Sequence, residues 1–180
     1  MWGLVHHDTM TEHAMTARFL EDAFAGESQA HMKYRLFADI AAKQGMPNIA
    51  RLLRSIAYAE LVHARNHLKA LGQVGDTEDN LAAAIEGETF EIEEMYPVYK
   101  QTAEMQDEEQ AERATHYALE AEKIHAELYK QAHEAAMKGD DLDLDVVYIC
   151  PVCGHTVVGD VPDCCPICGV KGERFEAFEA

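Results

Sequence analysis

The sequence predicts a mainly α-helical protein, a four-helix bundle followed by a small cysteine-rich β module. Four long stretches place apolar residues every three or four positions, which is the spacing of a helix face that packs into a bundle. Glycine or proline separates or closes these stretches. All five cysteines lie between Cys150 and Cys168, where the composition changes to Pro, Gly, Cys and Val. We therefore expect a helical domain at 10–139 and a metal-binding module at 146–180.

Composition and charge narrow the classes of function. The chain has 180 residues, 48% of them hydrophobic, which suffices for one full domain and a small one. Its net charge of −18 argues against nucleic acid and anionic membranes as partners. No run of about 18 apolar residues predicts a membrane span, and residues 1–10 lack the features of a signal peptide. Cysteines gathered in one segment indicate a metal site rather than a disulfide framework, which favours a reducing, cytoplasmic setting.

Local signals delimit the first two helices. Thr9 with Glu12 three residues later has the spacing of a capping box, so the first helix should begin there and end near Gly45. Pro47 suits the first turn of the second helix, which should end at Gly72.

The third helix is predicted over 79–105, with Pro97 inside it. Proline lacks the N–H that continues a helix, so Pro97 should kink the helix or open a bulge. The fourth helix should be capped by Asp107 with Gln110 behind it, and should end at Gly139. The acidic segment 140–145 reads as a linker, and short strands are expected at Val146–Ile149 and Arg174–Phe178.

The apolar faces of the four helices carry glutamates near their middles. A carboxylate inside a helix bundle is destabilising by several kcal/mol unless it is paired or bound to a metal. Lys and Arg are absent from these faces, so two divalent or trivalent cations are the expected source of positive charge. The five glutamates concerned are Glu27, Glu60, Glu88, Glu91 and Glu122.

An internal repeat organises four of these glutamates. The repeated elements recur 61 or 62 residues apart: Gly26-Glu27 and Gly87-Glu88, then Glu60-x-x-His63 and Glu122-x-x-His125. Residues three apart on a helix point to the same face and can reach one metal centre. Such paired sets occur in the helix bundles that bind two metals, and carboxylate with imidazole suits iron or manganese. Only Glu91 has no counterpart, and by itself it is either a ligand-supporting or a merely acidic residue.

The cysteines form two knuckles, Cys150-Pro-Val-Cys153-Gly and Cys165-Pro-Ile-Cys168-Gly, separated by eleven residues. Four thiolates in a tetrahedron fit either zinc or a single iron. The knuckles alone leave both open, and the neighbouring two-metal bundle favours iron, although zinc could occupy the site in a purified sample. Cys164 lies outside the two knuckles and is expected to be a bystander, with a ligand swap or a redox side reaction as the alternative.

Taken together, these residues resemble the rubrerythrin family from Leu20 to the C-terminus. The matching segments are Ala25-Gly-Glu-Ser28, Ala59-Glu-Leu-Val-His63-Ala64, Asn80-Leu81, Gly87-Glu88-x-x-Glu91, Met95-Tyr96-Pro97 and Ala121-Glu122-x-x-His125. The knuckles are similar to a rubredoxin-like domain. The resemblance implies a ferritin-like four-helix bundle followed by a rubredoxin-like domain.

The resemblance also implies roles for the ligands. Glu60 and Glu122 would bridge two irons, Glu27 would bind the first iron, and Glu88 and His125 would bind the second.

Four further roles follow from the same resemblance. Glu91 and His63 would alternate on the first iron, with the glutamate bound when it is oxidised and the histidine when it is reduced. Tyr34 and Tyr96 would lie near the site, and their alternative is as core aromatics with satisfied hydroxyls.

The activity implied is the reduction of hydrogen peroxide to water in oxidative-stress defence. Electrons would come from NAD(P)H through a separate reductase or a rubredoxin, pass through the Fe(Cys)4 site, and reach the di-iron site in a homodimer. The alternatives from other classes are a ferroxidase or iron-storage protein and a structural zinc protein. The electron-transfer module argues against the first, and the complete ligand set against the second.

Overall fold

The computed structural model describes residues 11 and 13–179, so the predicted capping box at Thr9 and Glu12 lies outside the described residues. Within them, the predicted fold class is confirmed as mainly helical with a small C-terminal sheet. No helix in the described ranges is both long and apolar enough to cross a membrane. Contacts divide the chain after Gly75 into two compact units.

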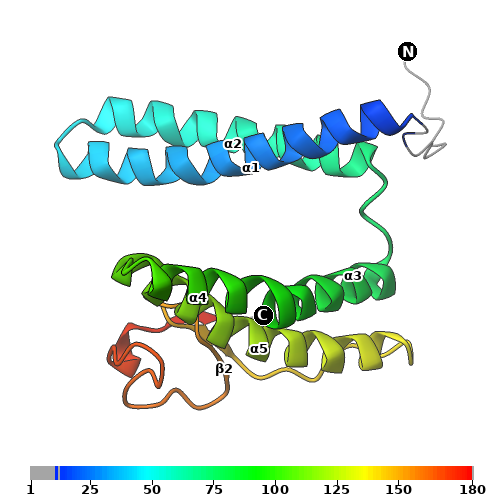
Figure 1. The fold of residues 1–180 in the computed structure, drawn as a ribbon, viewed down its shortest axis with the longest axis vertical. Coiled ribbons are helices and arrows are strands. Elements are labelled where there is room, and N and C mark those ends of the chain that lie inside the picture. Colours follow the sequence, from blue (N-terminus) through cyan, green and yellow to red (C-terminus); the bar gives the residue numbers. More distant parts are fainter. Residues whose placement is uncertain (1–10, 12, 180) are drawn as a thin grey trace. The chain divides into compact units, whose positions relative to one another are not determined.

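The first unit is a hairpin of two long helices, α1 (Ala14–Lys43) and α2 (Pro47–Ala70), which pack along each other (Figure 1). Its tight turn uses Gly45 at a φ of 75°, and Pro47 occupies the first turn of α2 as predicted. Small side chains let the two backbones approach closely. The buried residues of the hairpin are Ala38, Ala41, Ala50, Ala57 and Ala64.

The second unit contains the other long helices. The stretch α3 (Thr77–Phe90), η1 (Glu91–Met95) and α4 (Tyr96–Met105) packs on α5 (Glu109–Ala136). The bulge predicted from Pro97 is confirmed, because η1 is a π-helical turn in which the Tyr96 N–H donates to the Glu91 carbonyl. Proline next in the chain has no N–H to donate, which favours a local break in the α-helical ladder.

The predicted helix cap at Asp107 is wrong. Asp107 has a φ of 56°, and α5 starts after Glu108 without a side-chain cap. The N–H groups of Asp107 and Glu108 instead donate to Glu104 and Ala103 at the end of α4. This turn needs a left-handed residue, and aspartate tolerates that conformation better than most.

The C-terminal module is a three-stranded antiparallel sheet with two knuckles. Strands β1 (Val147–Ile149), β2 (Thr156–Val158) and β3 (Glu176–Phe178) pair in the order β2-β1-β3, with the short 3-10 turn η2 (Gly172–Arg174) before β3. The first and last strands agree with the sequence prediction, whereas β2 was not predicted. The core of the module consists of the cysteines themselves.

Candidate metal centres

The α1–α2 hairpin brings one set of predicted ligands together. Glu27 comes from α1, and Glu60 and His63 come from successive turns of α2. Nδ1 of His63 lies 3.0 Å from a carboxylate oxygen of Glu60 and 3.9 Å from one of Glu27. One ligand atom from each residue lies within 4.8 Å of the others, a spacing at which all three could bind one ion.

The second unit repeats this arrangement. Glu88 comes from α3, and Glu122 and His125 come from α5. Nδ1 of His125 lies 2.6 Å from Glu122 and 3.9 Å from Glu88, again with ligand atoms within 4.8 Å of one another. The repeat found in the sequence is therefore a repeat of geometry, with one carboxylate–histidine cluster on each helix pair.

The carboxylates of the second cluster crowd one another. Burial, followed by a hydrogen bond and charge repulsion from Glu122, raises the pKa of Glu88 to about 8 from an ordinary 4.5. Burial and the charge of Glu122 also raise the pKa of Glu91, although His125 opposes the shift. Proton uptake is the response of crowded carboxyl groups that have no cation nearby. A bound metal ion would supply that positive charge.

The remaining predicted residues lie on the same helices. Glu91 opens the π-helical turn one helical turn beyond Glu88. The pKa of Tyr96 is raised above its ordinary value of 10 by burial and then by the charges of Glu91, Glu122 and Glu88. Tyr34 lies two turns along α1 from Glu27, with its ring centroid 6.3 Å from that of Phe37. Its role beside the metal ligands remains a prediction.

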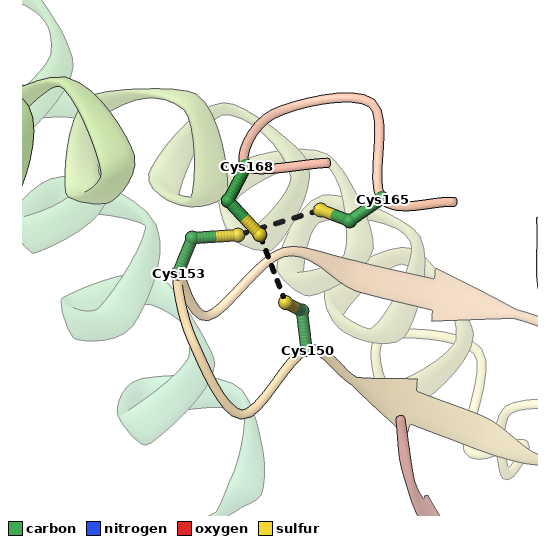
Figure 2. Close-up of side chains that lie close together, drawn as sticks. All are labelled: Cys150, Cys153, Cys165 and Cys168. Carbon is green, nitrogen blue, oxygen red and sulfur yellow. Dashed lines mark hydrogen bonds between the residues drawn. The ribbon is translucent and has the colours of Figure 1, made fainter. Parts of the chain in front are cut away.

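Four cysteines converge in the C-terminal module (Figure 2). Sγ of Cys150 lies 3.5 Å from Sγ of Cys168, and the same distance separates Cys153 from Cys165. A tetrahedral ion with metal–sulfur bonds of about 2.3 Å needs sulfurs about 3.8 Å apart, whereas a disulfide needs about 2.05 Å. The four thiols therefore fit one metal ion. Cys164 is exposed and lies outside this group, as the sequence predicted.

The two knuckles are built by matching backbone hydrogen bonds. The N–H of Gly154 donates to the Cys150 carbonyl at 3.0 Å, and the N–H of Gly169 donates to the Cys165 carbonyl at 2.9 Å. Both glycines have a positive φ, 79° and 74°, which turns the chain back at the second cysteine of each knuckle.

Backbone groups also act on the sulfurs. Burial alone would raise the pKa of Cys165, but N–H groups of Cys168 and Ile167 lower it to about 7. Burial raises the pKa values of Cys153 and Cys168. A metal ion bound by the four sulfurs would favour their ionised form.

The cysteine module packs against α5 within the second unit. Tyr117 packs on the buried cysteines, and a Cβ placed on Gly154 would lie 3.9 Å from Cβ of Ala121. Oγ1 of Thr156, on β2, lies 2.8 Å from Nε2 of His125. Sequence reasoning missed Thr156, because a threonine three residues after Cys153 belongs to no motif and is revealed only by packing.

These features define a class of protein. A mainly helical chain with two carboxylate–histidine clusters and a four-cysteine module has the ligand sets of a non-haem di-iron protein with a rubredoxin-like iron site. The family model described as rubrerythrin matches residues 18–133, and the model of the rubrerythrin rubredoxin-like domain matches residues 148–176. The chain belongs to the rubrerythrin family.

Individual relatives agree along almost the whole chain. Rubrerythrin-2 of Clostridium acetobutylicum is 48% identical over 93% of this chain and 98% of its own. Nigerythrin of Nitratidesulfovibrio vulgaris is 31% identical over 95% and 90%. A solved structure of nigerythrin in its fully reduced, all-ferrous state matches with a TM-score of 0.53 at 30% identity, covering 98% of this chain and 92% of that one. The carboxylate, imidazole and thiolate ligands of this chain are of the types that bind iron.

The crowding at Glu88 predicts a pH dependence for the metal-free protein. A carboxyl group whose pKa is raised on folding contributes stability below its ordinary pKa, and this contribution is lost as the pH rises through the folded value. We expect the urea midpoint of unfolding of metal-free protein to fall as the pH rises from 4.5 through about 8. In Glu88→Gln the dependence should be weaker. The control Glu86→Gln, an exposed residue of the same helix, should behave as wild type. Equal slopes in all three proteins would contradict the expectation.

Two adjacent cysteines give a matched test of the four-cysteine site. Cys165→Ser should abolish the visible absorption of the Fe(Cys)4 centre, because it removes a buried ligand sulfur. Cys164→Ser should leave that absorption unchanged, because this side chain is exposed and outside the cluster. Absorption spectra of the two iron-loaded variants make the comparison. Loss of the band in Cys164→Ser would show that the ligand assignment is wrong.

Proposed function

We propose that this chain is a cytoplasmic peroxidase that reduces hydrogen peroxide to water in oxidative-stress defence. Its electrons arrive one at a time through the four-cysteine iron. The observation that carries the proposal is the packing of the cysteine module on α5. The segment that follows Cys153 lies against the helix that carries Glu122 and His125, and Thr156 joins the two by a hydrogen bond. An electron carrier packed against a metal ligand is well placed to reduce the metal that this ligand binds.

The two carboxylate–histidine clusters would form one di-iron centre. In this proposal each cluster holds one iron, and Glu60 and Glu122 bridge the pair. The similar geometry of the clusters supports it, since each offers two carboxylates and one histidine with ligand atoms within 4.8 Å of one another. Charge supports it as well, because carboxylates crowded enough to take up protons are stabilised by cations.

The irons, when bound, would supply two electrons and polarise the O–O bond as Lewis acids. The residues of the chain supply position and protons. Tyr96 is protonated at neutral pH like any tyrosine, and burial raises its pKa further, so its hydroxyl is available to donate a hydrogen bond. Burial raises the pKa of Glu91, so its carboxyl group takes up a proton more readily than an ordinary glutamate when it is not bound to metal. Peroxide reduction takes up two protons and two electrons and releases two waters.

Glu91 and His63 would exchange as ligands of the first iron. The π-helical turn beginning at Glu91 supports such a movement, because it breaks the regular hydrogen-bond ladder at that point. The donor would be NAD(P)H acting through a separate reductase or rubredoxin, and the active form a homodimer.

A single addition of peroxide tests the proposal. Fully reduced, iron-loaded protein is mixed without oxygen with one equivalent of hydrogen peroxide, while the visible spectrum is recorded. We expect the absorption of oxidised Fe(Cys)4 to return rapidly as peroxide is consumed. A band that stays bleached while the other irons oxidise would instead favour ferroxidase or iron-storage activity.

The proposed exchange of ligands has its own test in Glu91→Ala. Turnover of peroxide should fall about 10- to 100-fold, the range typical of groups that support a metal site, while iron remains bound through the other ligands. Glu93→Ala is the matched control, because this exposed glutamate lies in the same π-helical turn. Steady-state peroxide consumption and iron content provide the comparison. Wild-type turnover in Glu91→Ala would rule out the exchange.

A further inference from the structure

A hydrogen-bonded chain joins His125 to the first cysteine knuckle. Nε2 of His125 lies 2.8 Å from Oγ1 of Thr156, and this Oγ1 lies 3.2 Å from the carbonyl oxygen of Gly154. Thr156 is 5% exposed, so its hydroxyl is shielded from water and depends on these partners. Gly154 directly follows Cys153, a predicted iron ligand.

When a metal is bound, the number of available protons fixes which group donates and which accepts in each of these hydrogen bonds. A neutral imidazole has one ring proton, so if Nδ1 faces the metal, Nε2 carries the proton and donates it. Oγ1 of Thr156 must then accept, and its own single proton has the Gly154 carbonyl as acceptor. The three groups are mutually satisfied only while Nδ1 points toward Glu88 and Glu122.

The other cluster has no such support. Among the described residues of its own unit, His63 has contacts through Nδ1 to Glu60 and Glu27, and none is found for its Nε2. Two clusters with the same ligands therefore differ in how firmly their histidines are held.

We propose that Thr156 is a positioning residue that locks His125 in its metal-binding orientation and so makes the Glu88–Glu122–His125 position the tighter of the two metal positions. The proposal rests on the di-metal function proposed above. The ring of His125 already points its Nδ1 lone pair at the metal position, whereas the ring of His63 must become ordered when its metal binds. Partners of this kind typically change metal affinity 10- to 100-fold.

Three variants separate the hydroxyl from the packing of Thr156. Thr156→Val keeps nearly the same shape and removes the hydroxyl, whereas Thr156→Ser keeps the hydroxyl and loses a methyl group. Thr115→Val is the matched control, because Thr115 also lies in the second unit and its hydroxyl donates only within α5, to Ala111 and Glu112. An intact Fe(Cys)4 spectrum in each variant shows that the module has folded.

The first measurement is metal affinity. Full-length protein with iron in the cysteines and empty carboxylate clusters is titrated with Co²⁺, and binding is followed by calorimetry. Thr156→Val should bind Co²⁺ about 10- to 100-fold more weakly at the tighter position and unchanged at the other. Thr156→Ser and Thr115→Val should match wild type. A loss in Thr156→Ser equal to that in Thr156→Val would assign the effect to packing and overturn the inference.

The second measurement observes the ring proton directly. In Co²⁺-loaded protein the N–H protons of the two ligating histidines are shifted away from other resonances by the metal. One of them should exchange slowly with deuterated water in wild type and rapidly in Thr156→Val. Unchanged exchange and affinity in Thr156→Val would overturn this inference alone. Wild-type protein that binds no Co²⁺ outside the cysteines would overturn the di-metal function and the inference together.

Discussion

The close approach of partly buried carboxylates is the physical constraint on which the rest of this structure depends. Glu88 and Glu122 are close enough that Glu88 stays protonated at a pH well above the ordinary pKa of a glutamate. The stretch of helix that supplies Glu88 also supplies Glu91, so charge of one sign accumulates along one face. Nothing apolar can neutralise it, and the faces concerned carry no lysine or arginine. A metal ion bound at each cluster would supply the missing positive charge.

Much of this arrangement could be predicted because it is local. Helix limits followed from Gly45 and Pro47, and the interruption of the third helix followed from Pro97. The clustering of Glu122 with His125 followed from their spacing of three residues on one helix. The prediction at Asp107 was wrong because a turn signal there resembles a capping signal, and only the actual path of the chain distinguishes the two.

What could not be predicted depends on packing between distant segments. The contact of the cysteine module with α5 is made by small or aromatic residues such as Gly154, Ala121 and Tyr117. Tyr117 and Ala121 share one face of the helix, but nothing in the sequence indicates that Gly154 packs there. Strand β2 is only three residues long and begins with Thr156, too short for alternation to be recognised. Thr156 and His125 are 31 residues apart, so their contact cannot be predicted from a local sequence pattern.

The π-helical turn has a consequence for the length of the chain. A π-helical turn takes about one more residue than an α-helical turn to make the same rotation. Deleting one residue within Glu91–Met95 would therefore allow regular α-helical winding and leave the segment from Tyr96 onward in nearly its present phase relative to Glu88. The face that α4 offers to α5 would be kept, whereas the break in the hydrogen-bond ladder beside Glu91 would be lost. The extra residue thus sets the local backbone geometry at Glu91 and not the alignment of the two helices.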